Sequence, residues 1–270
     1  MTEQTGILTT LPTIPFDEVK LPSLGLYYNH TKTLKGVKSI KVPYLTGREQ
    51  DVLLSPSILE SGKFIDRIID IKLADTGIDP NEMLSGDINA ILIFLRSTGI
   101  GDIYDTKLDC PLCKFENEKN WKLSDIPAKV DLEKPDKNGF LTFTTPLLKH
   151  EVIFAYLSRG EDEQIEAAVE GRIEKFGPGA EGLGTVGTMR MNRQIKSIGG
   201  NTDPLFISDY MNAVPYKDKM ELRRFMVKNE PGVSLDSEIK CARTSPRKCD
   251  FKTDMMLSIN PSFFWPDTEL

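Results

Sequence analysis

Four cysteines are the residues of this chain whose type and spacing could do chemistry. Cys110 and Cys113 form a C-x-x-C motif, and Cys241 and Cys249 form a second pair near the end of the chain. Thiolates are good ligands for Zn²⁺, and four of them close a structural site that leaves no position for water. If the two distant pairs meet in space, the sequence predicts one tetrahedral metal site, with zinc as the structural cofactor, joining the middle of the chain to its end.

Two other interpretations of the cysteines stay open. The four could be free or partly buried thiols, or Cys110 and Cys113 could be a redox pair of the thioredoxin type. The redox interpretation needs a βαβ pattern around the motif, which the sequence lacks. The gap between Cys241 and Cys249 is wider than the usual ligand spacing. It suits a metal site only if the residues between them form the loop of a hairpin.

The other patterns that could indicate an active site have simpler explanations. The string Gly177–Gly182 fits G-x-G-x-x-G, but a helical pattern precedes it where a dinucleotide fingerprint needs a strand, so a linker is expected. Glu161, Asp162 and Glu163 open a predicted helix, where negative charge suits the helix dipole. His30 and His150 are the only histidines and lie far apart. We therefore predict no catalytic residues and a protein that is not an enzyme.

Composition narrows the class of protein. The chain has 270 residues, a hydrophobic share of 39% and a net charge of −6. A mildly acidic chain lacks the basic footprint of non-specific nucleic-acid binding. The N-terminus has no signal-peptide pattern, and the longest apolar run, residues 88–95, is far too short to cross a bilayer. We expect a protein without a membrane segment in a reducing cytoplasm, where a C-x-x-C favours a metal over a disulfide.

Short hairpins are the elements expected to position the cysteines. Helical spacing of apolar residues predicts helices over 46–55, 61–74, 87–98, 161–175, 186–197, 204–213 and 216–228. Alternation predicts a strand at 36–45, hairpins within 104–126 and 141–158, and strands at 235–241 and 251–259. The expected fold class is α+β, with helical clusters, short β-hairpins and a zinc-ribbon-like cysteine site that joins two halves.

The predicted domain organisation has four parts. Residues 1–20 form an extended N-terminal arm, and residues 21–127 form an N-terminal α+β subdomain with the C-x-x-C knuckle. Residues 128–140 are a charged connection, and residues 141–270 form a C-terminal α+β subdomain with the second cysteine pair.

Three aromatic residues near the C-terminus are the candidates for a partner contact. This aromatic cluster consists of Phe263, Phe264 and Trp265. Its exposure to water is unfavourable, so it should be covered by other protein surface. We predict that they contact a partner protein, and packing within the domain is the alternative.

Several segments occur in a recognisable order along the chain: LPSLGLYY, PYLTGREQDVL, GDINAILIFLRSTGIGDIY with CPLC, LTFTTPLLKHEVIFAYLSRGEDEQI, MRMNRQIKSIGG, KMELRRFMVKNEPGV and the final FFWP. This order resembles the T4-like bacteriophage baseplate hub family, which includes hub subunits and hub assembly proteins. The resemblance covers about residues 20–126 and 141–266. It differs at the second cysteine pair, where the family has a short C-x-x-C followed by Gly and this chain has seven intervening residues followed by Asp250.

This resemblance implies a non-enzymatic tail protein that contacts other baseplate or hub proteins of a contractile tail, as a structural component or an assembly chaperone. It implies a location in the host cytoplasm during assembly and, for members that remain, in the baseplate of the virion. The alternative is a zinc-ribbon-like phage protein that binds nucleic acid or polymerase. The oligomeric state is left open by the sequence.

Overall fold

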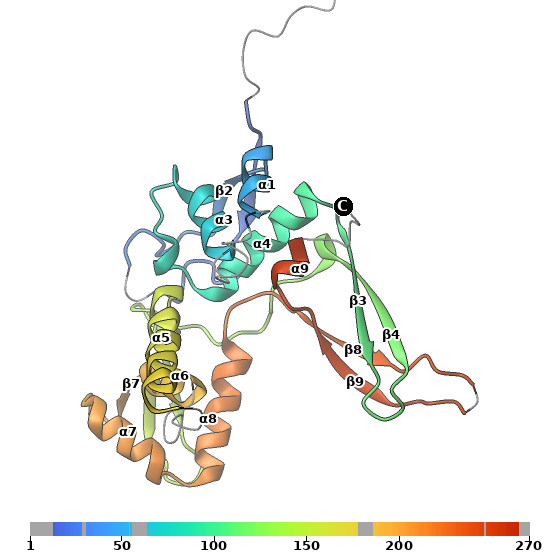
Figure 1. The fold of residues 1–270 in the computed structure, drawn as a ribbon. Helices are drawn as coiled ribbons and strands as arrows, with labels where there is room; N and C mark the ends of the chain where they lie inside the picture. Colours follow the sequence, from blue (N-terminus) through green and yellow to red (C-terminus); the bar gives the residue numbers. More distant parts are fainter. Residues whose placement is uncertain are drawn as a thin grey trace, which may run out of the picture.

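Two helical lobes and a projecting β arm make up the protein (Figure 1). The computed structural model describes residues 13–28, 31–53, 55, 64–177, 186–245 and 247–264. Helices and small antiparallel sheets alternate along the chain, so the expected α+β class is confirmed. None of the helices in these ranges is long and apolar enough to cross a membrane.

The N-terminal lobe packs helices against a two-stranded sheet. Strand β1 (Phe16–Lys20) pairs antiparallel with β2 (Ser39–Pro43). The sequence assigned residues 16–20 to the extended arm, and this was wrong for them because Val19 is buried and opposes Ile40 in the sheet. Residues 1–12, the rest of that arm, lie outside the described ranges. The helical elements that follow are α1 (Gly47–Leu53), α3 (Phe64–Leu73), the 3-10 turn η1 (Pro80–Glu82) and α4 (Ser85–Gly99).

The C-terminal lobe surrounds a three-stranded antiparallel sheet in the order β5-β6-β7. Its strands are β5 (Leu141–Thr144), β6 (Glu151–Phe154) and β7 (Ile195–Ile198). Its helices are α5 (Arg159–Phe176), α6 (Val186–Gln194), α7 (Pro204–Ala213) and α8 (Tyr216–Asn229). The helix expected over 186–197 ends at Gln194, because Ile195 and Ile198 are buried in the sheet and pair with β6.

The β arm consists of two hairpins from distant parts of the chain. The first is β3 (Ile103–Asp109) with β4 (Glu116–Lys122), followed by the 3-10 turn η2 (Leu123–Asp125). The second is β8 (Asp236–Lys240) with β9 (Lys252–Met256). Figure 1 shows the green and red hairpins running side by side, away from the helical lobes. Both hairpins were expected from the sequence.

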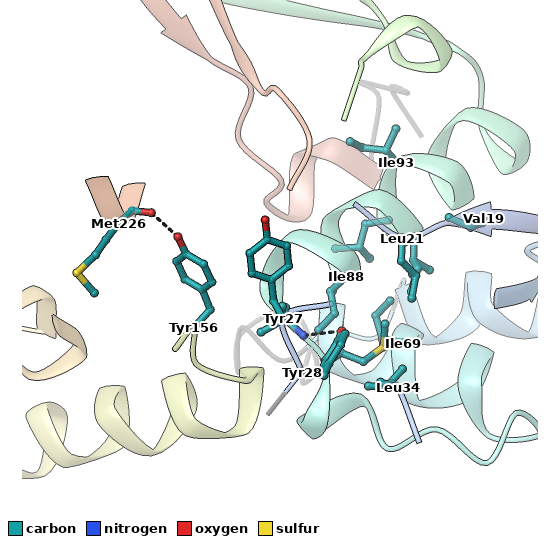
Figure 2. Packing of buried hydrophobic residues seen from close by; sticks show 14 of the residues in the cluster. Val19, Leu21, Tyr27, Tyr28, Leu34, Ile69, Ile88, Ile93, Tyr156 and Met226 are labelled. Atoms are coloured by element: carbon teal, nitrogen blue, oxygen red, sulfur yellow. Dashed lines mark hydrogen bonds between the residues drawn. The ribbon is translucent and has the colours of Figure 1, made fainter. Parts of the chain in front are cut away.

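A continuous hydrophobic core joins the lobes. Figure 2 shows Tyr27 of the N-terminal lobe facing Tyr156 of the C-terminal lobe, and their ring centroids lie 5.9 Å apart. The Tyr156 hydroxyl donates to the Met226 carbonyl of α8 at 2.7 Å. The Tyr27 hydroxyl donates to the Glu133 carbonyl at 2.7 Å, which fastens the connection between the lobes to the same core.

A buried carboxylate holds the segment before β2 against α4. The Oδ2 atom of Asp87 accepts hydrogen bonds from the hydroxyls of Ser23, at 2.5 Å, and Tyr28, at 2.7 Å, and Oδ1 accepts from the Ser23 amide at 2.9 Å. Burial raises the pKa of Asp87, although these hydrogen bonds oppose the rise. The network satisfies a group that would otherwise be costly to bury.

Two segments from the last part of the chain pack against α4. Gly86 lies so near Pro231 that a Cβ at position 86 would sit 2.0 Å from the Pro231 carbonyl oxygen. The short helix α9 (Pro261–Phe264) packs near the other end of α4, where the Arg96 Nε atom donates to the Phe263 carbonyl at 2.7 Å. The last part of the chain therefore returns to the N-terminal lobe, as the red helix in Figure 1 shows.

Candidate metal centre

The turn of the first hairpin holds Cys110 and Cys113. The Cys110 amide donates to the Phe115 carbonyl at 2.8 Å, and the Lys114 amide donates to the Cys110 carbonyl at 2.9 Å. Lys114 takes a left-handed conformation with φ of 57°, which is uncommon for a residue with a side chain. This tight turn points both sulfur atoms to the same side of the hairpin.

The turn of the second hairpin brings Cys241 and Cys249 together despite the seven residues between them. The Cys241 amide donates to the Phe251 carbonyl at 2.9 Å, and the Cys249 amide donates to the Arg243 carbonyl at 3.1 Å. The intervening residues thus form a hairpin loop with one cysteine on each side. That is the condition under which the wide spacing suits a metal site.

The four sulfur atoms meet between the two hairpins. All of them lie within 4.8 Å of one another. The Cys113 and Cys241 sulfurs are 3.6 Å apart, and the Cys110 and Cys249 sulfurs are 4.0 Å apart. A tetrahedral zinc site with Zn–S bonds of about 2.3 Å puts its sulfurs about 3.8 Å apart. The donor set therefore fits Zn²⁺ in both ligand type and spacing.

The environment of the thiols opposes full ionisation without a cation. Burial works against the Cys113 thiolate, but hydrogen bonds from the Phe115 amide and the Arg243 side chain outweigh it and lower the pKa of Cys113 to about 6. At Cys249 the Phe251 amide favours the thiolate, yet burial and the neighbouring sulfurs raise the pKa to about 11. One thiolate forms easily and the next is repelled by it. A bound divalent cation would reverse this repulsion.

A buried asparagine ties the two hairpins together beside the sulfurs. The Asn117 side chain of β4 accepts a hydrogen bond from the Ala242 amide at 2.8 Å. Its Nδ2 atom donates to the carbonyls of Phe115, at 2.9 Å, and Leu108, at 3.3 Å. Sequence reasoning missed this residue, since its polar neighbours in β4 give no sign that it is buried.

The cysteine cluster lies at the free end of the β arm, under a surface that is partly apolar. Cys110, Cys241 and Cys249 are buried, and Cys113 is partly exposed. Around them the side chains of Leu112, Phe115 and Phe251 are 70%, 40% and 39% exposed. The sulfurs are thus shielded on the inside by the hairpins, while apolar side chains face the solvent at the tip.

The aromatic candidates near the C-terminus have a different environment. Phe263 and Phe264 are buried, and their rings make edge contacts with Tyr104 at 5.0 Å and Phe64 at 6.0 Å between centroids. This is the packing within the domain that the sequence offered as the alternative. A partner can reach these rings only if α9 leaves its place. Trp265 lies outside the described residues.

The remaining sequence candidates do not join the centre. His150 lies in the C-terminal lobe, where its Nδ1 atom is 2.9 Å from the Tyr210 hydroxyl. Glu161, Asp162 and Glu163 begin α5 as expected, and Asp162 forms an ion pair with Arg190 at 2.7 Å. His30 and most of the Gly177–Gly182 string fall outside the described ranges. Within those ranges the four cysteines are the one cluster of at least three potential metal ligands.

Comparison with known proteins identifies a family. A family model described as T4 bacteriophage base plate protein matches residues 26–265. No curated protein matches the chain. No solved structure matches it either.

Proposed function

The chain belongs to the T4 bacteriophage base plate protein family, and from this membership we propose a non-enzymatic role in the hub of the baseplate. The family match spans both lobes and the β arm. The membership itself makes it a bacteriophage baseplate protein. The narrower assignment, to the hub of a contractile tail as a structural component or an assembly chaperone, rests on the resemblance of its ordered segments. Its function in either case is to bind other baseplate proteins.

The use of buried polar groups supports a structural role. Asp87 fastens the N-terminal lobe, and Asp218, which is fully buried, accepts hydrogen bonds from the Leu147 and Leu148 amides at 2.8 and 3.0 Å. Arg96 links α4 to α9. Each of these groups holds the fold together, whereas catalytic groups usually face a cleft and a substrate.

We also propose that Cys110, Cys113, Cys241 and Cys249 bind one structural Zn²⁺. The ion would supply a cross-link between two hairpins that belong to distant parts of the chain. Four thiolates leave no open position for a substrate. The chain's own contribution is to hold the sulfurs near tetrahedral spacing and to direct amide hydrogen bonds at them, so the arm is a rigid projection that a partner can recognise.

The tip of the arm is the contact point that we assign to the baseplate function. Leu112, Phe115 and Phe251 expose apolar surface next to the metal centre. Apolar side chains held in fixed positions lose little conformational entropy when a partner covers them. A structural metal at this place would therefore support binding without taking part in any reaction.

Co-expression with the other baseplate proteins of its phage tests the proposed function. We expect native mass spectrometry of the tagged full chain to show a complex with at least one baseplate protein and none with the major capsid protein, which serves as the control. A chain that binds no baseplate protein contradicts the proposal.

The alternative of nucleic-acid or polymerase binding finds less support. The basic residues near the second cysteine pair are partly neutralised, because Asp250 forms ion pairs with Lys240 at 2.8 Å and Lys248 at 3.3 Å. Phosphate contacts would make retention on heparin strong and steeply dependent on salt. We expect the chain to elute from heparin at low salt, and salt-sensitive retention at moderate salt would favour the alternative.

A further inference from the structure

A groove in the C-terminal lobe lies between α6 and α8, outside the β arm that carries the four cysteines. Its volume is about 480 Å³, and its floor includes the buried side chains of Tyr156, Met191 and Met226. On the α8 side each lining residue has another three or four positions away along the helix. This spacing places them in a single stripe along the helix. The stripe consists of Tyr216, Lys219, Met220, Arg223, Met226, Val227 and, just past the end of the helix, Glu230.

The stripe includes apolar side chains that are open to solvent. Tyr216 is 77% exposed and Val227 is 57% exposed, and Met220 lies between them on the same face. Neighbouring apolar side chains that border a hollow often mark a protein-binding site. Four turns of α8 line this groove, so its length suits a helix lying alongside better than a small molecule.

The charge of the groove points to the kind of helix. The chain as a whole is acidic, with a net charge of −6, but the groove has three cationic side chains, Arg190, Lys219 and Arg223, against one carboxylate, that of Glu230. Arg190 already pairs with Asp162 and Glu166. Lys219 donates one hydrogen bond to the Met211 carbonyl at 3.0 Å and keeps two further N–H groups. Arg223 is exposed and forms no ion pair with any other residue that the structure describes.

We propose that this groove binds an acidic amphipathic helix from another baseplate protein. The apolar face of that helix packs on Tyr216, Met220 and Val227, and its carboxylates face Arg223 and Lys219. The proposal rests on the proposed function for the class of partner, and on the groove for the chemistry of the contact. The groove is a second binding surface, in addition to the one at the tip of the β arm.

Site-specific crosslinking identifies the occupant. The full chain carries p-benzoylphenylalanine at position 227 and is co-expressed with the other baseplate proteins of its phage. The matched control carries the same group at position 228, which is exposed on α8 but does not line the groove. We expect position 227 alone to crosslink to an acidic helical segment of another baseplate protein. Crosslinks to a second copy of this chain, to its own residues 178–185, or to no protein overturn the proposal.

Charge reversal then tests the recognition of that segment. The probe is the synthetic peptide of the crosslinked sequence, added to the full chain. We expect Arg223→Glu to weaken binding by about tenfold and to reduce its dependence on salt, because a charge at the rim of an interface contributes chiefly through long-range attraction. The control Lys228→Glu changes the same net charge outside the groove and should alter binding by less than about twofold. Equal effects of the two substitutions on peptide binding contradict the proposal that the peptide binds in the groove.

The two proposals can fail separately. If the wild-type chain and the Arg223→Glu chain form baseplate complexes of equal stability, the proposed binding in the groove is wrong. The proposed baseplate function then still stands. If the wild-type chain forms no such complex, the proposed function itself fails.

Discussion

The sulfur of Cys110 lies 4.0 Å from the sulfur of Cys249, although 139 positions separate the two residues in the sequence. The two cysteines belong to different hairpins, and the hairpins form different two-stranded sheets. Between the sheets, Asn117 links the hairpins by a hydrogen bond, and the Thr106 hydroxyl lies 3.6 Å from the Met255 sulfur. The centre therefore depends on how two distant segments pack, and this dependence leads to the first two predictions.

We expect the purified chain to hold one zinc ion and Cys249→Ser to lose it. Removing one thiolate leaves three ligands, and a structural zinc site is strongly coupled to folding. Native mass spectrometry gives the metal content, and hydrogen exchange should show faster exchange in the β arm of the variant. The helical lobes keep their own core and should exchange as before.

Ser245→Ala is the control for the cysteine substitution, because Ser245 lies in the same loop but is not a ligand. It should keep the metal. A Cys249→Ser chain that keeps its zinc and its exchange pattern would contradict the four-thiolate site.

Asn117→Ala should release metal faster and lower the free energy of unfolding by about 1–3 kcal/mol, because the Ala242 amide loses its buried acceptor. Release is followed with a chromogenic chelator, and stability by urea denaturation. The control is Asn120→Ala, since Asn120 is exposed on the same strand and its side chain donates to Asp105 within its own hairpin. Equal release rates for the two variants would show that Asn117 has no part in holding the centre.

Gly86→Ala should lower the free energy of unfolding by at least about 1–3 kcal/mol, the usual effect of overpacking. The new methyl group would meet the Pro231 carbonyl oxygen at 2.0 Å, and backbone atoms cannot move aside as a flexible side chain can. Gly171→Ala in α5 is the control, because among the described residues its added Cβ meets no atom within 4 Å beyond its chain neighbours and the nearby helix backbone. It should raise stability by about 0.5–1 kcal/mol. Thermal and urea denaturation compare the two, and a neutral Gly86→Ala would contradict the close approach.

Arg96→Met should expose α9 to solvent. The substitution roughly keeps the side-chain volume but removes donors from the carbonyls of Phe263 and Gly101, at about 1–3 kcal/mol for each buried acceptor left unpaired. Hydrogen exchange of residues 261–264 should quicken. The exposed Arg67 provides the control Arg67→Met, which should change neither stability nor exchange. Unchanged exchange in the Arg96 variant would mean that α9 is held by its aromatic packing alone.

Acid should destabilise the wild-type chain in part through Glu49. Burial raises the pKa of this carboxyl, but the ion pair with Lys72 at 2.7 Å and the hydrogen bonds from Thr46 outweigh it, so its pKa in the folded state is lowered. The stabilisation is present above the unfolded-state pKa of about 4.3 and is lost as the pH falls through the folded-state value. Glu49→Gln combined with Lys72→Met removes the pair without leaving a buried charge.

The double variant should lose less stability than the wild type between about pH 6 and pH 3, as measured by urea denaturation. Both chains contain Asp87 and the acid-sensitive cysteine site. The raised pKa of Asp87 makes stability change with pH in the opposite direction to Glu49. The effects of Asp87 and of the cysteine site cancel in the comparison. Parallel stability curves would rule out a contribution from Glu49.

The sequence by itself determined the chemistry and the local elements of this protein. The C-x-x-C turn, the strands beside both cysteine pairs and most helices follow from residue spacing, because turns, caps and amphipathic faces depend on neighbours in the chain. It erred where long-range pairing overrode local pattern: residues 16–20 join a sheet through β2, and Ile195–Ile198 leave a helix for a strand beside β6. Only the tertiary structure decided that the seven-residue gap closes, that Asn117 is buried between hairpins and that Phe263 faces inward. Each of these features depends on contacts between residues far apart in the sequence, and such contacts cannot be predicted from the spacing of neighbouring residues.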